Sequence, residues 1–201
     1  VAPHGMRSFF EYMIRQETEN AKKGLPSGIT VKVNSLVDPK IIELLYEASK
    51  AGVRVQLIVR GICCLIPGIE GVSENITVMS IVGQLLEHSR IFRFENAGNP
   101  RIYMGSADWM PRNLDRRVEL VFPIEDETQK ARAFGILDTM LSDTTNARFM
   151  QSDTSYEHVD LRGKKKISSQ LTFYHEAQAR LKELQSIEKD SVLIPIHSAE
   201  E

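Results

Sequence analysis

The feature that most constrains the fold of this chain is a strand–helix–strand pattern near its N-terminus. Residues 29–33 alternate between apolar and polar side chains, which is typical of a β-strand. Asp38 and Pro39 then predict a helix start, because aspartate caps helix N-termini and proline fits the first helical position. The helix should end at Gly52, and residues 53–59 form another β-rich run. The short connections predict a parallel βαβ unit.

The remaining segments predict further strands and helices around this unit. An amphipathic helix is expected over residues 6–23, and a loop over residues 61–75. Further strands are predicted at 76–82, 91–94, 101–105, 117–123 and near 148–150, and helices at 126–141 and 168–184. The fold class that follows is α/β, with a mixed β-sheet flanked by helices.

Charge and cysteine usage narrow the classes of partner and compartment. The formal net charge is −2, so no global field steers this chain toward nucleic acid. Any polyanion must therefore meet a local cluster of Arg and Lys. No apolar run approaches the ~20 residues that a transmembrane helix requires. Cys63 and Cys64 lie in an apolar run, which predicts two buried, reduced thiols and a cytoplasmic protein.

The segment that begins at His88 contains residues suited to phosphate chemistry. If a strand begins at His88, alternation places His88 and Arg90 on one face. The guanidinium can neutralise and orient phosphate oxygens, while the imidazole can attack phosphorus or donate a proton to a leaving oxygen. Glu95 has the opposite parity and is expected to form a structural pair. His88 is therefore the candidate catalytic residue.

A second polar group closes the neighbouring strand. Gly105 allows close approach of a phosphate to the backbone, and Ser106 and Asp108 share a face. The order H-x-R-x4-E followed by G-S-x-D resembles the phospholipase D superfamily pattern, H-x-K-x4-D followed by G-S-x-N. This chain has Arg for Lys, Glu for Asp and Asp for Asn, and its loop before G-S is longer. The resemblance implies a phospholipase-D-like fold.

Four longer stretches resemble the C-terminal region of bacterial polyphosphate kinases. They read GLPSGITVKVNSLVD, LIVRGICCLIPGI, SIVGQLLEHSRIFRFEN and GSADWMPRNLDRRVE. The resemblance covers residues 5–175. It implies that residues 1–185 form the phospholipase-D-like C-terminal domain of such an enzyme, and residues 186–201 are expected to form a flexible tail.

That family reversibly transfers the terminal phosphate of ATP to polyphosphate, with Mg²⁺. In that family, the second phospholipase-D-like domain contributes an arginine and a histidine that contact the nucleotide phosphates. By position these two residues match Arg60 and His88. Arg60 also ends a predicted parallel strand, where ligands of open α/β sheets gather. An arginine there can bind a phosphate bidentately, and His88 can act as a general acid–base group near neutral pH.

The predicted site combines these matches with nearby polar residues. Arg112 and Asn113 directly follow the G-S strand, whereas Arg116 and Arg117 should point to opposite faces. Trp109 is expected in the core. No metal ligands are predicted in this chain, so Mg²⁺ would accompany ATP. The predicted ATP- and phosphate-binding residues are Arg60, His88, Arg90, Ser106, Arg112 and Asn113.

The resemblance also implies a histidine that becomes phosphorylated in a preceding domain. No segment here resembles that domain, and Val1–Ala2–Pro3 resembles the interior of a longer chain, so this chain alone is expected to be inactive. ATP, ADP, polyphosphate and the remaining domains of the same enzyme are the expected partners, with no nucleic acid. The full enzyme is expected to be a homo-oligomer, cytoplasmic or associated with a membrane.

Two other functions remain open from the sequence. A short phospholipase-D-type phosphodiesterase or nuclease can build its site from two copies of the H-x-R motif in a homodimer. A module without catalysis could instead bind polyanions through Arg60 alone. The replacements in the motif and the four longer stretches argue against the phosphodiesterase.

Overall fold

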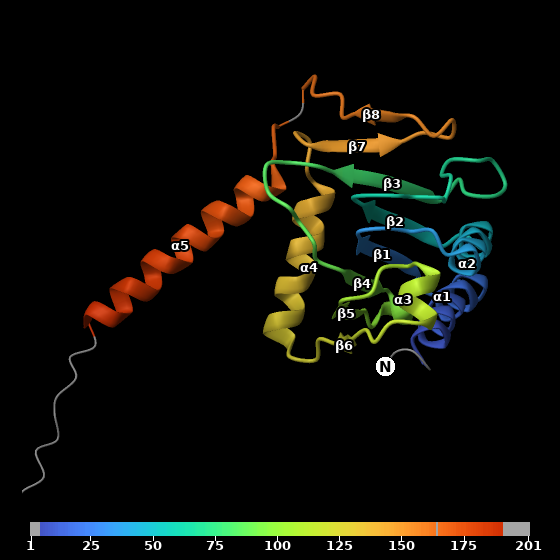
Figure 1. Cartoon of the computed structure of the whole chain (residues 1–201), viewed down its shortest axis with the longest axis horizontal. Helices are drawn as coiled ribbons and strands as arrows, with labels where there is room; N and C mark the ends of the chain where they lie inside the picture. The colour runs from blue at the N-terminus through green and yellow to red at the C-terminus, as the bar shows by residue number, and fades with distance from the viewer. Residues whose placement is uncertain (1–4, 164, 191–201) are drawn as a thin grey trace, which may run out of the picture.

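One mixed β-sheet forms the centre of the structure (Figure 1). The computed structural model describes residues 5–163 and 165–190. Its strands are β1 (Gly28–Val33), β2 (Arg54–Val59), β3 (Ile76–Ile81), β4 (Ile91–Phe94), β5 (Arg101–Gly105), β6 (Val121–Pro123), β7 (Ala147–Met150) and β8 (Tyr156–His158). They lie in the order β6-β5-β4-β1-β2-β3-β7-β8. The central β1, β2 and β3 are parallel, and the pairs toward both edges are antiparallel.

The predicted βαβ unit is present between β1 and β2. Helix α2 (Pro39–Lys50) begins where expected, since the Asp38 carboxylate accepts a hydrogen bond from the Ile41 N–H at 3.0 Å. Proline occupies its first turn, where a missing N–H costs nothing. A buried stripe along α2, including Ile41 and Leu45, packs toward the sheet. The local signals and the tertiary packing therefore favour the same helix.

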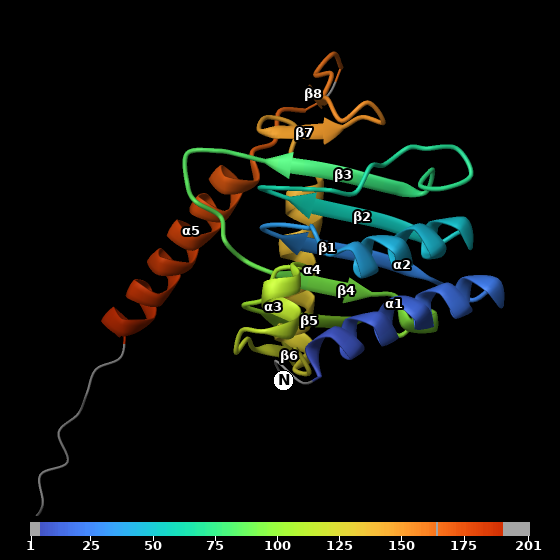
Figure 2. The same cartoon turned by 45° about the vertical axis from the view of Figure 1, so that its right-hand side comes forward.

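Helices cover both faces of the sheet (Figure 2). Helix α1 (Met6–Lys22) lies beside α2 on one face, and α4 (Glu127–Leu141) covers the other. Successive strand residues point to opposite faces and pack into two separate hydrophobic cores. Leu57 lies in the core on the α1 and α2 side, and Ile58 lies in the core on the α4 side. Trp109 is fully buried against Phe10 and Phe92, which confirms its predicted core position.

Helix α5 (Ser169–Asp190) extends away from the sheet in both views (Figures 1 and 2). The helix continues to Asp190, so the predicted start of a flexible tail at residue 186 falls within a helix. The rest of that predicted tail, residues 191–201, lies outside the described residues. None of the described helices is long and apolar enough to cross a membrane.

Several sequence-based details differ in the structure. The strand predicted over 117–123 is limited to Val121–Pro123, since only these residues pair with β5. The segment before it contains a short helix that the sequence did not predict, α3 (Pro111–Asp115). Cys63 is half-buried but Cys64 is exposed, so the prediction of two buried thiols is wrong for Cys64. Burial raises the pKa of the Cys63 thiol to about 11.

The strand directions bring many chain segments to one edge of the sheet. Because β1, β2, β3 and β5 run the same way, their C-terminal ends meet at this edge. The N-terminal ends of the antiparallel β4, β6 and β7 lie at the same edge. Ligands of open α/β sheets bind at such an edge. The predicted site residues should therefore be found there.

Candidate active site

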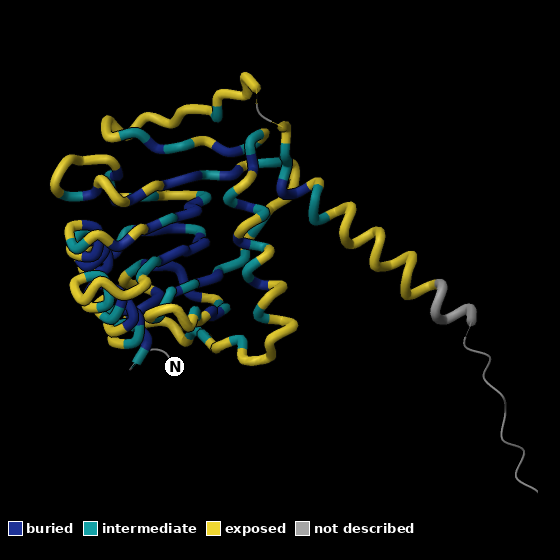
Figure 3. Tube along the Cα trace, turned by 180° about the vertical axis from the view of Figure 1, so that it is seen from behind, coloured by how far each residue is buried: buried dark blue, intermediate teal, exposed yellow. Residues whose placement is uncertain are grey.

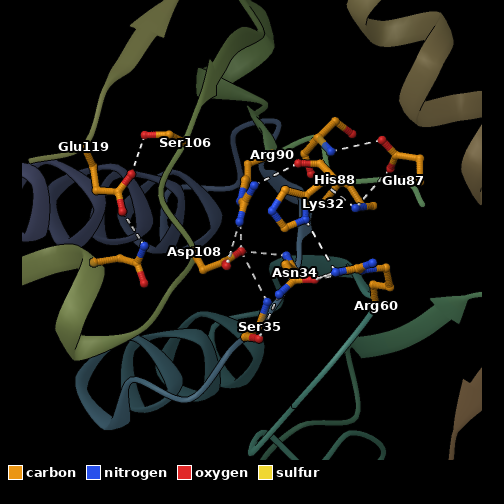
Figure 4. A network of polar contacts seen from close by, with 12 residues as sticks. Lys32, Asn34, Ser35, Arg60, Glu87, His88, Arg90, Ser106, Asp108 and Glu119 are labelled. Carbon is orange, nitrogen blue, oxygen red and sulfur yellow. Dashed lines mark hydrogen bonds and ion pairs between the residues drawn. The ribbon is translucent and has the colours of Figure 1, made fainter. Parts of the chain in front are cut away.

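The predicted residues Arg60 and His88 meet at this edge, beyond the ends of β1 and β2 (Figure 4). Arg60 Nη2 lies 3.5 Å from His88 Nδ1. The side chain of Asn34, directly after β1, accepts hydrogen bonds from Arg60 Nε at 2.8 Å and from Nη2. Gly61 is required here, because a Cβ on it would lie 2.9 Å from the Asn34 carbonyl oxygen. These contacts hold the Arg60 guanidinium against the imidazole.

Asp108 ties Arg90 to the end of β1. Arg90 donates to both carboxylate oxygens of Asp108, from Nε at 3.1 Å and from Nη2 at 3.0 Å. The backbone N–H groups of Asn34 and Ser35 also donate to Asp108, at 2.7 and 3.3 Å. Arg90 Nη1 donates to the His88 carbonyl at 2.9 Å. Asp108 therefore positions both Asn34 and the backbone of His88.

A buried ion pair supports the segment that carries His88. Lys32, on β1, is only 2% exposed, and its Nζ lies 3.1 Å from Glu87 Oε2. The same Nζ donates to the Ser89 carbonyl at 3.2 Å. Burial lowers the pKa of Lys32 while the Glu87 carboxylate opposes that change. For Glu87, burial acts against ionisation, but hydrogen bonds from Ser89 and the charge of Lys32 lower its pKa overall.

The environment of His88 favours its neutral form. Loss of solvation and the positive charges of Arg90 and Arg60 lower the pKa of His88, and Asp108 only partly opposes them. The imidazole is exposed at the sheet edge, so a ligand can reach it. A neutral ring at pH 7 can accept a proton or a hydrogen bond, and a bound anion would raise its pKa.

We expect His88 to titrate below the ordinary histidine pKa of about 6.5. Arg60→Ala should raise this pKa, because it removes one of the nearby positive charges. The imidazole carbon-bound protons, followed by NMR across the pH range, report the midpoint. A midpoint that is unchanged or lower in Arg60→Ala would contradict the electrostatic coupling of these two residues.

Two of the other predicted residues, Ser106 and Asn113, form a separate hydrogen-bonded group with Glu119 (Figure 4). The Ser106 hydroxyl donates to Glu119 Oε2, and Asn113 Nδ2 donates to Glu119 Oε1 at 2.5 Å. Asn113 is buried, whereas the Arg112 side chain is exposed. Gly105 packs against the loop that follows α3, because a Cβ on it would collide with the Leu120 carbonyl. Close packing alone therefore explains why position 105 is a glycine, without a phosphate contact.

The prediction that strand alternation places His88 and Arg90 on one face is wrong. The strand begins at Ile91, so the segment from His88 to Arg90 lies outside β4 and strand alternation does not apply to it. His88 and Arg90 are instead brought together by the hydrogen bond from Arg90 to the His88 carbonyl. The predicted structural role of Glu95 fits its ion pair with Arg93, 3.3 Å away.

Four further residues that build the site were not predicted from the sequence. These are Lys32, Asn34, Glu87 and Glu119. A signal was present for the first two, since Lys32 lies on a strand of the predicted βαβ unit, where a buried lysine is costly unless it is paired. Asn34 lies two residues after Lys32, so strand alternation directs both side chains toward the same face of the sheet.

Comparison with known proteins gives the family. The model of "Polyphosphate kinase C-terminal domain 2" matches residues 1–170. The polyphosphate kinase of Lactiplantibacillus plantarum is 50% identical over 182 residues, which cover 90% of this chain and 25% of that protein. The polyphosphate kinase of Parasynechococcus marenigrum is 56% identical over 156 residues, or 78% of this chain and 22% of that protein. The chain thus spans about a quarter of the length of these relatives.

Solved structures agree. The polyphosphate kinase of Porphyromonas gingivalis superposes with a TM-score of 0.83 at 37% identity, covering 88% of this chain and 27% of that one. NucT of Helicobacter pylori superposes with a TM-score of 0.52 at 14% identity, covering 70% of this chain and 92% of that one, which shows a shared fold alone. The expected α/β, phospholipase-D-like fold is confirmed, and the phosphodiesterase hypothesis is not favoured. This chain belongs to the polyphosphate kinase family, as its C-terminal domain 2.

Proposed function

We propose that this domain binds the phosphates of ATP and polyphosphate in a reversible phosphotransferase. The observation that carries this proposal is the contact of Arg60 with His88 at the C-terminal edge of the sheet, 3.5 Å between Nη2 and Nδ1. Arg60 is held by the neutral side chain of Asn34, and the described residues give it no carboxylate partner. Its positive charge is therefore available to an anion that also reaches the imidazole.

Arg60 and His88 would have different roles. Arg60 would bind and orient phosphate oxygens, while His88 would transfer a proton or hydrogen-bond to the phosphoryl group in the transition state. The lowered pKa of His88 suits this role, since the ring is neutral before the anion binds. Arg90 donates to Asp108 and to the His88 carbonyl, and its remaining Nη N–H groups are proposed to contact the same phosphate. Ser106, Arg112 and Asn113 are proposed as contacts farther along the phosphates.

Mg²⁺ would enter with the nucleotide. The Asp108 carboxylate lies beside Arg90, but its two oxygens already accept from Arg90 and from backbone N–H groups. Within the described part of the chain, no three His, Cys, Asp or Glu side chains gather as metal ligands would. Mg²⁺ commonly binds through substrate phosphates and water, where it neutralises phosphate charge. We therefore propose that Mg²⁺ binds as part of the MgATP substrate.

The phosphorylated histidine of the enzyme would come from residues outside this sequence. The curated relatives are about four times as long as the matched region, which leaves room for such a domain. Phosphoryl transfer depends on positioned groups on both sides of the phosphate, so this chain alone is expected to bind phosphates without turnover. Assembly of the full enzyme into a homo-oligomer remains a prediction.

Calorimetry of this chain with MgATP and with polyphosphate tests the proposal. Arg60→Ala should weaken both affinities roughly 10- to 150-fold, the effect of losing one charged phosphate contact. Arg54→Ala is a matched control, because Arg54 is exposed at the opposite end of the same strand. Equal losses in the two variants, or no binding by the unaltered chain, would contradict a phosphate site at Arg60.

A further inference from the structure

A hollow lies next to Arg60, on the side away from His88. Its volume is about 420 Å³, and Arg60, Ser80, Arg148 and His158 are among the residues that line it. Its walls come from the ends of β2, β3, β7 and β8, whereas His88 precedes β4 on the other side of β1. Arg60 therefore belongs to both places. The outer strand β8 is exposed along its length (Figure 3).

Strand register aligns the polar side chains of this hollow. Ser80 pairs with Arg148 between β3 and β7, and Arg148 pairs with His158 between β7 and β8. Directly opposed residues in antiparallel strands point to the same face, so the three side chains form one row. The Ser80 hydroxyl also lies 3.4 Å from the Arg60 carbonyl oxygen. Strands are about 4.8 Å apart, so the row extends roughly 10–15 Å from β2.

The charges in the hollow are unbalanced. Arg60 and Arg148 both line it, and no carboxylate of the described residues does. Arg148 is exposed, and its side chain makes no hydrogen bond or ion pair with the described residues. Glu157 has the opposite strand parity to His158, so it points to the other face. Two cations that share one hollow without an acid favour a bound anion.

We propose that this hollow is a second phosphate subsite, which holds a polyphosphate chain that continues past Arg60 toward Arg148 and His158. This inference rests on the proposed function, since it takes the same polymer as ligand. The length of the row favours a polymer, because a single phosphate or a triphosphate held between Arg60 and His88 does not extend across two further strands. The subsite would hold the part of the polymer away from the reacting end.

Calorimetry with three ligands tests this subsite: long-chain polyphosphate, tripolyphosphate and MgATP. Arg148→Ala should weaken binding of the long chain roughly 10-fold and leave the two short ligands within about twofold. Arg148→Lys should restore part of the loss, and Arg148→Ala with His158→Ala should increase it. The Arg148 side chain is exposed and makes no hydrogen bond with the described residues, so the fold should tolerate these changes, which circular dichroism verifies.

The ligand series separates the two proposals. Unchanged affinity for the long chain in Arg148→Ala would overturn the subsite, even where Arg60→Ala weakens all three ligands. Equal losses for MgATP and the long chain would also overturn it, because the hollow would then hold the nucleotide. If Arg60→Ala weakens none of the ligands, the phosphate site at Arg60 fails, whatever Arg148→Ala does. Arg54→Ala again serves as the control for general loss of positive charge.

Discussion

Asp108→Ala should lower the free energy of unfolding by about 3–5 kcal/mol, because it leaves a largely buried arginine without its partner. The Asp108 side chain is 6% exposed and that of Arg90 is 11% exposed. The substitution also removes the acceptor of the Asn34 and Ser35 N–H groups. Urea denaturation followed by circular dichroism measures the change.

The matched control is Asp115, which forms a similar two-point contact with Arg7 at 2.6 Å. Its side chain is 42% exposed, so Asp115→Ala should cost at most about 1 kcal/mol. Asp108→Asn should lie between the two alanine variants, because the amide oxygen can still accept from the backbone but the charge is lost. Similar losses for Asp108→Ala and Asp115→Ala would contradict the structural role of Asp108.

His88→Ala should reduce phosphoryl transfer about 10²- to 10⁴-fold in a full-length polyphosphate kinase that carries this domain. The imidazole is exposed at the sheet edge, so the variant should remain as stable as the parent. The loss should appear in kcat, since His88 is proposed to act in the transition state, whereas Arg60→Ala should mainly raise KM. Steady-state rates with MgATP, in both directions, provide the measurement.

The control for His88 is His175, a second exposed histidine, on helix α5. His175→Ala should leave kcat unchanged. An unchanged kcat in His88→Ala would contradict the catalytic role of His88 and leave only the binding role of Arg60. A loss of the same size in His175→Ala would show that the assay responds to something other than the site.

Much of the fold could be predicted from local patterns. Alternation predicted β1, the Asp38–Pro39 pair predicted the start of α2, and glycine marked the position where that helix ends. These signals act within a few residues, and packing favours the same conformation. The short strand at Val121–Pro123 was misjudged, because its length depends on pairing with β5. Pairing partners lie far apart in sequence and leave no local signal.

Residue types and their order within short motifs also identified Arg60 and His88 as candidates and related the chain to its family. The sequence by itself predicted most of the elements, the core pattern and these candidate residues, because all three depend on near neighbours along the chain. Only the tertiary structure decided which groups meet. Contacts of Arg60 with Asn34 and His88, and of Arg90 with Asp108, join separate segments. Their geometry depends on strand order, since the direction of each strand sets which end reaches the common edge.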